Sequence, residues 1–460
     1  MTSKDSATNL WIMLTIVAAC FGLAVGQLDG TIVNVALPEL SVALHGTVTD
    51  LQWVVDAYTL MLAALMLSAG MVSDRFGARR AYLIGLVGFA LTSTACGVAR
   101  TAGELIVARA VQGAAAALLV PPGLALLNNA CAHDQRLRAR AVAWWSQAGA
   151  ACIALGPVVG GVILHWQSWR SIFFVNLPLC AGGILLTLRL KEIPRVERGR
   201  MDVAGQLLTI LTLVALTGAV IELPRLGLDH PVVWGGFVTA VIAGAVLLAV
   251  ESRAENPVVP LAFFRQPSYV TAVGFGALLN LTYFGMLFVL SLYLQRVRGY
   301  TPAEAGSAYL PLTATFIVSH AVSGRMTARV GSRLPMVLGA AIAAIGFFSL
   351  IQLDADSPYS HMVIPFLIIP GGLGLASPAM ITSVLAGADK ARAGTATAVL
   401  NTARQLGGAT GVAIFGALVV GGKDRIVPGL HTAIVVATVL LVVAMLAAWR
   451  GIPHKQGSSR

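Results

Sequence analysis

The sequence predicts an all-α polytopic membrane protein, and three observations lead to this fold class. Hydrophobic residues make up 57% of the 460 positions and charged residues only 11%, whereas roughly a quarter of a soluble domain is charged. The mean hydropathy is +0.81. Long apolar stretches follow one another along the chain, and basic residues gather in alternate connections between them. No soluble fold of this length could bury so much apolar surface, so a large soluble core is excluded.

Each apolar stretch approaches or exceeds the ~20 residues that a helix needs to cross a bilayer. The first ends without an A-x-A cleavage site, so we expect a retained helix rather than a signal peptide. The fourteen predicted spans are residues 10–37, 51–71, 80–99, 103–127, 140–164, 170–189, 204–223, 232–250, 268–294, 304–324, 334–352, 361–384, 397–421 and 430–449.

The spans divide into two blocks of six, separated by a linker that itself crosses twice. Polar stretches from Arg189 to Asp202 and from Glu251 to Arg265 mark the two breaks. The linker spans carry no charge except Glu222, so we expect them to be lipid-facing spacers. The predicted parts are an N-terminal six-helix bundle, the two-helix linker and a C-terminal six-helix bundle, at residues 1–190, 191–264 and 265–460.

The distribution of basic residues predicts the orientation. Seven of the 31 Lys and Arg residues lie in odd-to-even connections, and 22 lie at the termini or in even-to-odd connections. By the positive-inside rule both termini are cytoplasmic, which requires an even number of crossings and agrees with fourteen. Topology therefore explains the net charge of +11, and we expect a lipid bilayer but no nucleic acid as partner. The predicted location is the cytoplasmic (inner) membrane.

No catalytic or cofactor motif is found in the sequence. HExxH, GxSxG and clustered His or Cys ligands are absent, and so is a G-x-x-x-x-G-K-[ST] phosphate loop. The five cysteines are scattered without a CxxC pair, and we expect them to be small apolar core residues. We predict no enzyme, no metal site and no cofactor, and we expect a monomer.

Three charged residues inside the spans are the leading functional candidates, because an ionisable group at membrane depth is costly. Asp29 lies in the first span, Asp56 in the second and Arg109 in the fourth. At about 1.5 Å per residue they fall in one layer, ~8–12 Å below the predicted outer surface, and we predict that this layer binds the proton. Three alternatives stay open: a structural salt bridge for Asp29, a helix-capping role for Asp56, and snorkelling toward the surface for Arg109.

A glycine-bounded turn follows the second span. Its two glycines permit tight turns, and its acid could lie against an arginine or a helix N-terminus. An ordinary basic loop is an equally good explanation. The same glycine spacing recurs from Gly324 to Gly331 in the second block, as internal repeats of transporters would predict. The candidate gate residues of the turn are Gly70, Asp74, Arg75, Gly77 and Arg79.

A string of small residues, Gly156-Pro157-Val158-Val159-Gly160-Gly161, lies in the fifth span. Small residues let helices touch backbone to backbone, and Pro157 would bend the span. We predict a conformational role for Gly156, Pro157, Gly160 and Gly161, with plain helix packing as the alternative.

Together these strings resemble the fourteen-helix drug:proton antiporter branch of the major facilitator superfamily. Gly70–Arg80, Arg109–Gly113 and Gly156–Gly161 are similar to its loop, helix-4 and antiporter signatures, and Asp29–Pro38 is similar to its helix-1 pattern. The resemblance implies the major facilitator fold, with two six-helix bundles plus two extra central helices. It also implies a cytoplasmic latch made by Asp74 and Arg75 against the second block. Other matching stretches are Gln52–Tyr58, Trp169–Pro178 and Asn401–Gly408.

The chain departs from the family pattern at four positions. Ala78 replaces a usual basic residue of the loop, and Ala148 and Cys152 replace glycines of the helix-5 pattern. Ala328 stands where the second copy of the loop would need an acid, so only the first copy can form a charged latch.

The expected substrate cavity combines apolar area with a few polar groups, as small-molecule sites tend to do. Arg404 could attract anions or steady the inner gate, and His320 is expected to be a hydrogen-bonded core residue, with a proton role as the alternative. The candidate cavity residues are Gln27, Asn34, Trp53, Tyr58, Gln112, Asn280, Tyr283, Phe284, Asn401 and Arg404.

We therefore predict a proton-coupled antiporter that exports drugs, antibiotics or other lipophilic small molecules by alternating access, driven by the proton gradient. Its partners are protons, a small-molecule substrate and the bilayer. A transporter of one specific metabolite is the main alternative, and a receptor without transport is a weaker one.

Overall fold

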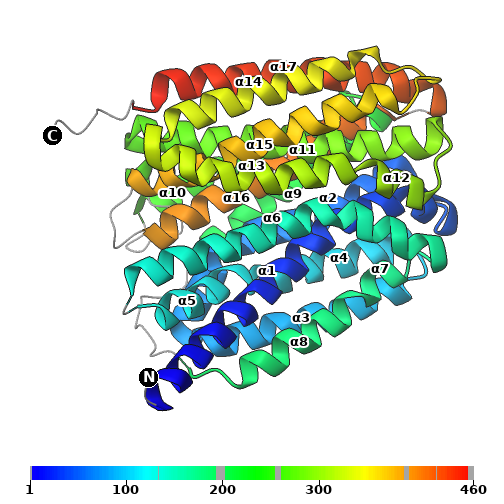
Figure 1. The fold of residues 1–460 in the computed structure, drawn as a ribbon. Helices are drawn as coiled ribbons and strands as arrows, with labels where there is room; N and C mark the ends of the chain where they lie inside the picture. The colour runs from blue at the N-terminus through cyan, green and yellow to red at the C-terminus, as the bar shows by residue number, and fades with distance from the viewer. Residues whose placement is uncertain are drawn as a thin grey trace.

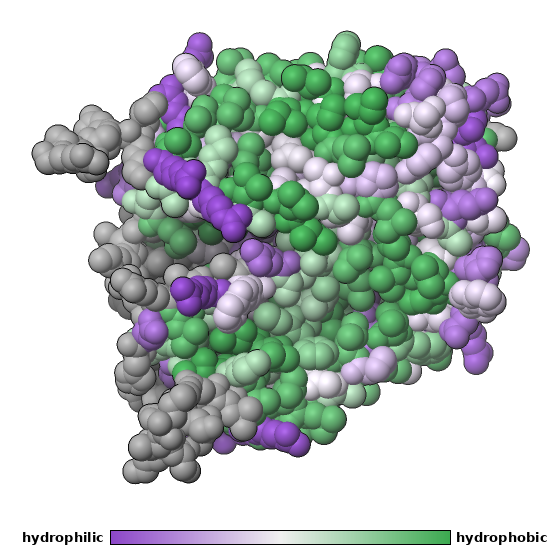
Figure 2. Space-filling view, in the orientation of Figure 1, coloured by the Kyte–Doolittle hydropathy of each residue, from purple (hydrophilic) through white to green (hydrophobic). Residues whose placement is uncertain are grey.

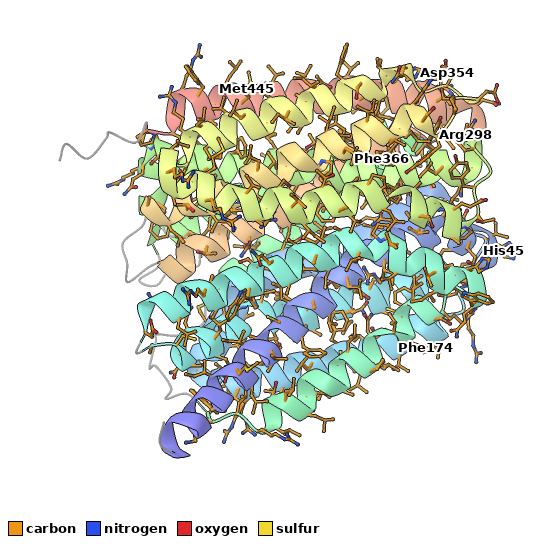
Figure 3. All side chains as sticks on the ribbon, in the orientation of Figure 1. His45, Phe174, Arg298, Asp354, Phe366 and Met445 are labelled. Carbon is orange, nitrogen blue, oxygen red and sulfur yellow. The ribbon has the colours of Figure 1, made fainter. Side chains whose placement is uncertain are left out.

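The computed structural model is a bundle of long helices and describes residues 3–132, 134–192, 203–253, 261–387, 393–420 and 422–453. The first turn of α1 and the last turn of α17 lie at the same end of the molecule, on the left of Figure 1. We call this the terminal end. The opposite, far end carries the connections around His45, Phe174, Arg298 and Asp354, which Figure 3 labels. Termini at one end agree with an even number of crossings.

The first bundle and the linker contain ten helices in the described residues. They are α1 (Ser3–Ala43), α2 (Val48–Phe76), α3 (Ala78–Val98), α4 (Ala102–Ala117), α5 (Val120–Ala130), α6 (Gln135–Trp166), α7 (Ser171–Phe174), α8 (Asn176–Leu188), α9 (Val203–Leu226) and α10 (Pro231–Arg253).

The second bundle begins after the linker. It comprises η1 (Leu261–Arg265), α11 (Pro267–Leu292), the π-helical turn η2 (Tyr293–Val297), α12 (Pro302–Ala308), α13 (Leu310–Val330), α14 (Arg333–Ser349), η3 (Leu350–Gln352), α15 (Ser360–Ala386), α16 (Ala393–Ala417) and α17 (Lys423–Gly451).

Eleven helices of the described residues are long and apolar enough to cross a membrane. Three further spans that the sequence predicts, in α2, α13 and α16, are not among these eleven, and they carry the polar residues Asp56, His320 and Arg404. Figure 2 shows the apolar middle of the molecule between polar side chains at its two ends. The structure is therefore consistent with fourteen crossings.

Three predicted spans are interrupted rather than continuous. The predicted span 103–127 is divided into α4 and α5 just before Pro121 and Pro122. The span 304–324 is divided at Tyr309. Helix α13 begins at the next residue, Leu310, and has Pro311 in its first turn. Proline lacks a donor and clashes with the preceding turn, so the helix restarts there. The third break separates α7 from α8 at Val175, three residues before Pro178.

The internal repeat is visible in the way the second helix of each bundle begins and ends. Thr47 starts α2 and Thr301 starts α12, each in a capping box with an acid three residues later. At the terminal end, Gly77 and Gly331 both adopt positive φ angles, 97° and 82°. Such angles favour glycine, which explains why both copies of the turn keep it.

The linker helices lie against the two bundles rather than forming a separate unit. Helix α9 packs on α10, on α2 and on α16. The side-chain amide of Gln206 donates to the backbone oxygen of Ala64 in α2 at 2.6 Å. The expectation of a lipid-facing spacer is therefore wrong for this face of α9, because a polar side chain there finds its partner on the first bundle. Much of α10 remains exposed.

The two bundles contact each other mainly toward the far end. One continuous cluster of buried apolar residues joins the far half of α1, from Ile32 to Leu40, to the core of the second bundle. The other two clusters lie entirely within the first bundle. Backbone oxygens of α1 also accept hydrogen bonds from the second bundle: Asn34 from Ser291, and Val35 from Gln295 at 2.9 Å. The far end is therefore closed in this structure.

Candidate functional site

Asp29 lies at the centre of a buried polar network in the first bundle. Its side chain is 0% exposed, and it forms an ion pair with Arg109 of α4. Two amides also donate to its Oδ1, from Asn176 at 2.7 Å and from Gln112 at 3.1 Å. Ser93 of α3 accepts hydrogen bonds from the same two amides. Three helices besides α1, namely α3, α4 and α8, thus meet around one carboxylate, which accepts every bond, as an ionised carboxylate does.

Arg109 has partners besides Asp29. Its Nε donates to the backbone oxygen of Val54 at 3.1 Å, and its Nη1 donates to Oε1 of Gln112 at 2.7 Å. Its guanidinium carbon lies 4.2 Å from the ring centroid of Tyr58, a cation–π contact. Because several groups hold the guanidinium, its position does not depend on the carboxylate alone. The side chain is 1% exposed, so it does not snorkel to the surface.

This geometry explains the spacing in the string Arg109–Gly113. Arg109 and Gln112 are three residues apart on α4 and therefore reach the same network. Gly113 is needed for a different reason: a Cβ there would collide with the backbone oxygen of Tyr58 in α2. The glycine allows α4 to lie directly on α2, and that contact brings Arg109 within reach of both Val54 and Asp29.

Asp56 lies apart from the network and is placed differently. Its side chain is 0% exposed, and neither carboxylate oxygen has a hydrogen-bond partner among the described residues. One turn earlier, the amide of Gln52 donates to Val412 and Ala413 of α16, so this face of α2 points at the second bundle. The far-end closure therefore covers Asp56. A carboxylate without a donor is costly to bury, and the neutral acid is the less costly form there.

A small cavity lies between the bundles beside the Asp29 network. It is lined by Gly26, Gln27 and Gly30 of α1, by Tyr58, Thr59 and Leu62 of α2, and by Phe284 and Gln405 of the second bundle. The structure thus brings together three of the ten predicted cavity residues: Gln27, Tyr58 and Phe284.

Other predicted cavity residues lie elsewhere. Trp53 packs against Gly218 of the linker helix α9. Gln112 belongs to the Asp29 network. Asn34 is buried at the contact with α11, where its amide donates to Thr31 at 3.2 Å.

The second bundle contributes its own polar group, which contains the remaining cavity candidates. Arg404 of α16 donates to Asn280 of α11 and to Asn401, over 3.4 and 3.5 Å. His320 of α13 stacks on Phe316, which in turn approaches Tyr283, with ring centroids 5.1 and 6.3 Å apart. His320 is not the hydrogen-bonded core residue that the sequence suggested, because its Nδ1 has no partner among the described residues.

The glycine-bounded turn is held mainly within its own bundle. Arg79 donates from Nε to Thr187 at 3.0 Å and from Nη2 to Leu188 at 2.7 Å, at the last turn of α8. Gly70 lies near Pro121, and Gly77 lies close to Glu192. Arg75 is exposed, with its guanidinium 5.8 Å from the ring centroid of Phe76. The side chain of Asp74 lies outside the described part of the chain, so the latch stays a prediction.

The glycine string of α6 contacts two different helices. Gly156 and Gly160 face α1, where a Cβ would meet Thr31 and Ile32. Gly161 faces the second bundle: a Cβ there would lie 2.7 Å from the backbone oxygen of Pro302 and 3.0 Å from Cα of Gly306. Conversely, a Cβ at Gly306 would lie 2.5 Å from the backbone oxygen of Pro157. The string therefore attaches α6 to its own bundle and, at Gly161, to the opposite one.

Asn176 and Ser93 complete the network, and the sequence did not identify them as site residues. Both are neutral polar residues inside apolar spans, and Asn176 belongs to a string that already resembled the family pattern. Depth along the helix was the signal that could have found them, since each lies in the same half of its span as the three charges.

A buried charged network in one bundle, beside a cavity between two bundles, is the arrangement of a membrane transporter. The chain belongs to the Major Facilitator Superfamily, whose sequence profile matches residues 19–412. It is 36% identical to the Methylenomycin A resistance protein of Streptomyces coelicolor, over 96% of this chain and 93% of that protein. It is 33% identical to the Tetracenomycin C resistance and export protein of Streptomyces glaucescens, over 90% of this chain and 77% of that protein.

Solved structures agree with this fold. The D-xylose-proton symporter superposes with a TM-score of 0.70, covering 98% of this chain and 100% of that one, at 15% sequence identity. At that identity the likeness concerns the fold alone.

Proposed function

We propose that this protein exports antibiotics or other lipophilic small molecules across the cytoplasmic membrane in exchange for protons. The observation that carries the proposal is the fully buried Asp29–Arg109 pair beside the inter-bundle cavity. Proton coupling requires a carboxylate that binds a proton in one conformation and releases it in another. The relatives named for methylenomycin A and tetracenomycin C resistance support export as the direction.

The far end is the outer side in this proposal, and both termini are cytoplasmic. The positive-inside distribution of the sequence supports this orientation. The structure then corresponds to an outward-closed state. Opening of the far end would separate α2 from α16 and expose Asp56 to outer water, so Asp56 would take up a proton before the far end closes over it.

Asp29 would receive its proton when the network rearranges. Arg109 keeps Val54, Gln112 and Tyr58 as partners when the Asp29 carboxylate becomes neutral, so the cation is not stranded. Loss of the ion pair would loosen α1 from α4. Helix α1 contacts α6 within the first bundle and α11 across the interface. Protonation at one buried site would thereby change how the two bundles fit.

The decisive experiment is reconstitution in liposomes with an acid interior and a pH indicator outside. We expect methylenomycin A, tetracenomycin C or a lipophilic test anion or cation to evoke proton release while the compound accumulates inside. Protein-free liposomes and liposomes whose gradient has been collapsed by an ionophore serve as controls. Compound uptake at the control rate, from protein shown to be folded, would refute proton-coupled transport.

Tyr58 is expected to couple the cavity to the proton network. Its ring lines the cavity and also stacks on Arg109, and its hydroxyl donates to Gly26 of α1 at 2.8 Å. Tyr58→Leu removes both contacts, so we expect at least about a tenfold loss of coupled turnover, corresponding to ~1.4 kcal/mol. Tyr58→Phe keeps the ring and should retain most of the turnover. The measurement is the initial rate of substrate-evoked proton release, and equal losses of this rate in the two variants would contradict a role for the ring.

A further inference from the structure

Arg404 is a cation that the second bundle does not neutralise. Its guanidinium reaches only two neutral amide oxygens, at 3.4 and 3.5 Å, which is the outer limit of hydrogen bonding. Within the described residues it forms no ion pair. The described acids that follow residue 265, namely Glu304, Asp354, Asp356 and Asp424, all lie at helix starts or in connections. A half-buried cation with such weak partners favours an anion from outside the chain.

The acids of the first bundle do not supply that anion. Asp29 is already paired with Arg109 and bound by two amides. Asp56 lies closer to the far end, since α2 and α16 run antiparallel and Gln52 meets Val412 whereas Ala63 meets Thr402. About five residues of helix, ~8 Å, separate the level of Asp56 from that of Arg404. Neither carboxylate therefore balances the charge of Arg404 in this structure.

The surroundings of Arg404 indicate what such an anion would be attached to. Gln405, the next residue of α16, and Phe284 line the inter-bundle cavity. From Phe284 an aromatic row continues through Tyr283 and Phe316 to the ring of His320, with neighbouring centroids 5.1–6.3 Å apart. His320 lies within electrostatic reach of Arg404, and its unpartnered Nδ1 can bind a further polar group. The row offers apolar area, and Arg404 with His320 offers a polar end.

We infer that Arg404 is a specificity-determining residue and that the transported compounds include lipophilic acids, whose carboxylate binds Arg404 and whose apolar body lies against the aromatic row. This inference deepens the proposed function and rests on it for the direction of transport. A planar guanidinium suits a carboxylate because it can donate two parallel hydrogen bonds. His320 would donate to the same acid or to a neighbouring oxygen of the compound.

The test compares three probes that share one apolar body: 1-pyrenebutyrate, its methyl ester and 4-(1-pyrenyl)butyltrimethylammonium. Binding is measured by pyrene fluorescence on the full-length protein in phosphatidylcholine nanodiscs. We expect the acid to bind at least about tenfold more tightly than the ester, and the cation to bind most weakly. Arg404→Gln should remove that preference, weakening the acid about tenfold or more while leaving the ester within about threefold.

Arg298→Gln is the matched control, because Arg298 is a half-buried arginine of the same bundle, at the far end, whose Nη1 donates to Ala355. It should leave all three affinities unchanged. Equal binding of acid and ester by the wild type would overturn the inference. So would an Arg404→Gln variant that loses all three probes by one factor, since that result would mean a packing role. Loss of the preference for the acid when phosphatidylglycerol is added would assign the site to a lipid headgroup and would also overturn it.

The same probes separate this inference from the proposed function. Charge-selective binding without substrate-evoked proton release would leave the carboxylate site in place and refute proton-coupled export. Proton release evoked by the pyrenyl cation but not by the acid would support export and refute the assignment of Arg404.

Discussion

Asp29→Asn is expected to abolish proton-coupled export while the protein still inserts in the membrane. Asparagine keeps the shape of the side chain, but it can neither bind and release a proton nor neutralise Arg109. The buried guanidinium would then lack its counter-ion, and breaking one partner of a buried pair typically costs about 3–5 kcal/mol of stability. The measurements are substrate-evoked proton release in liposomes and the thermal unfolding temperature in detergent.

A double variant separates the loss of coupling from the loss of stability. Asp29→Asn with Arg109→Gln removes both charges, so the unfolding temperature should recover toward that of the wild type while coupled export stays absent. Glu39→Gln is the matched control on the same helix, because within the described residues Glu39 accepts only from the backbone nitrogen of Trp169, at 3.0 Å, and glutamine can accept that bond too. Wild-type proton release by the Asp29→Asn variant would refute the assignment and move the coupling site to Asp56.

Gly161→Val is expected to arrest the transport cycle by preventing closure of the far end. In the closed structure there is no room for a side chain at Gly161, because backbone atoms of Pro302 and Gly306 occupy that space. Backbone cannot yield as a flexible side chain can, so the two bundles would have to stay apart. We expect turnover to fall by at least about tenfold, since a blocked conformational step limits the whole cycle. Substrate affinity should change little.

Closure can be observed directly. Spin labels on unnatural amino acids at Val42 and Asp356, both exposed at the far end, would report the distance between the bundles without removing the native cysteines. The distance should be longer in Gly161→Val than in the wild type. Gly274→Val is the control, because a Cβ at Gly274 meets nothing within 4 Å. Normal turnover together with an unchanged distance in the Gly161 variant would show that this contact is not part of the gate.

The sequence by itself determined the class of the protein and the identity of the charged site. Composition alone requires a membrane protein, because a chain of this length cannot bury so much apolar surface in its own core and must expose part of it to lipid. The cost of burying a charge then identifies Asp29, Asp56 and Arg109 without knowledge of any contact. The second glycine of each repeated turn could also be identified from the sequence, since the positive φ angles of Gly77 and Gly331 tolerate few other residues.

Only the tertiary structure decided how these residues are used. Depth along a helix placed the three charges in one layer, but the direction in which each side chain points depends on which helices are neighbours. Asp29 meets Arg109 because Gly113 brings α4 onto α2, whereas Asp56 faces α16. Asn176 joins the network from α8, 147 positions along the chain from Asp29.

The partners of neutral residues were the least predictable. From local pattern, Trp53 was expected to line the cavity, and the linker helix that carries Gln206 was expected to face lipid. Each residue instead lies in the contact between α2 and α9. The weak bonds of Arg404 likewise depend on Asn280 from another helix. Such contacts follow from the packing of helices distant in sequence, which no local periodicity records. The sequence thus set which residues had to be buried, and the packing of the two bundles decided what each of them met there.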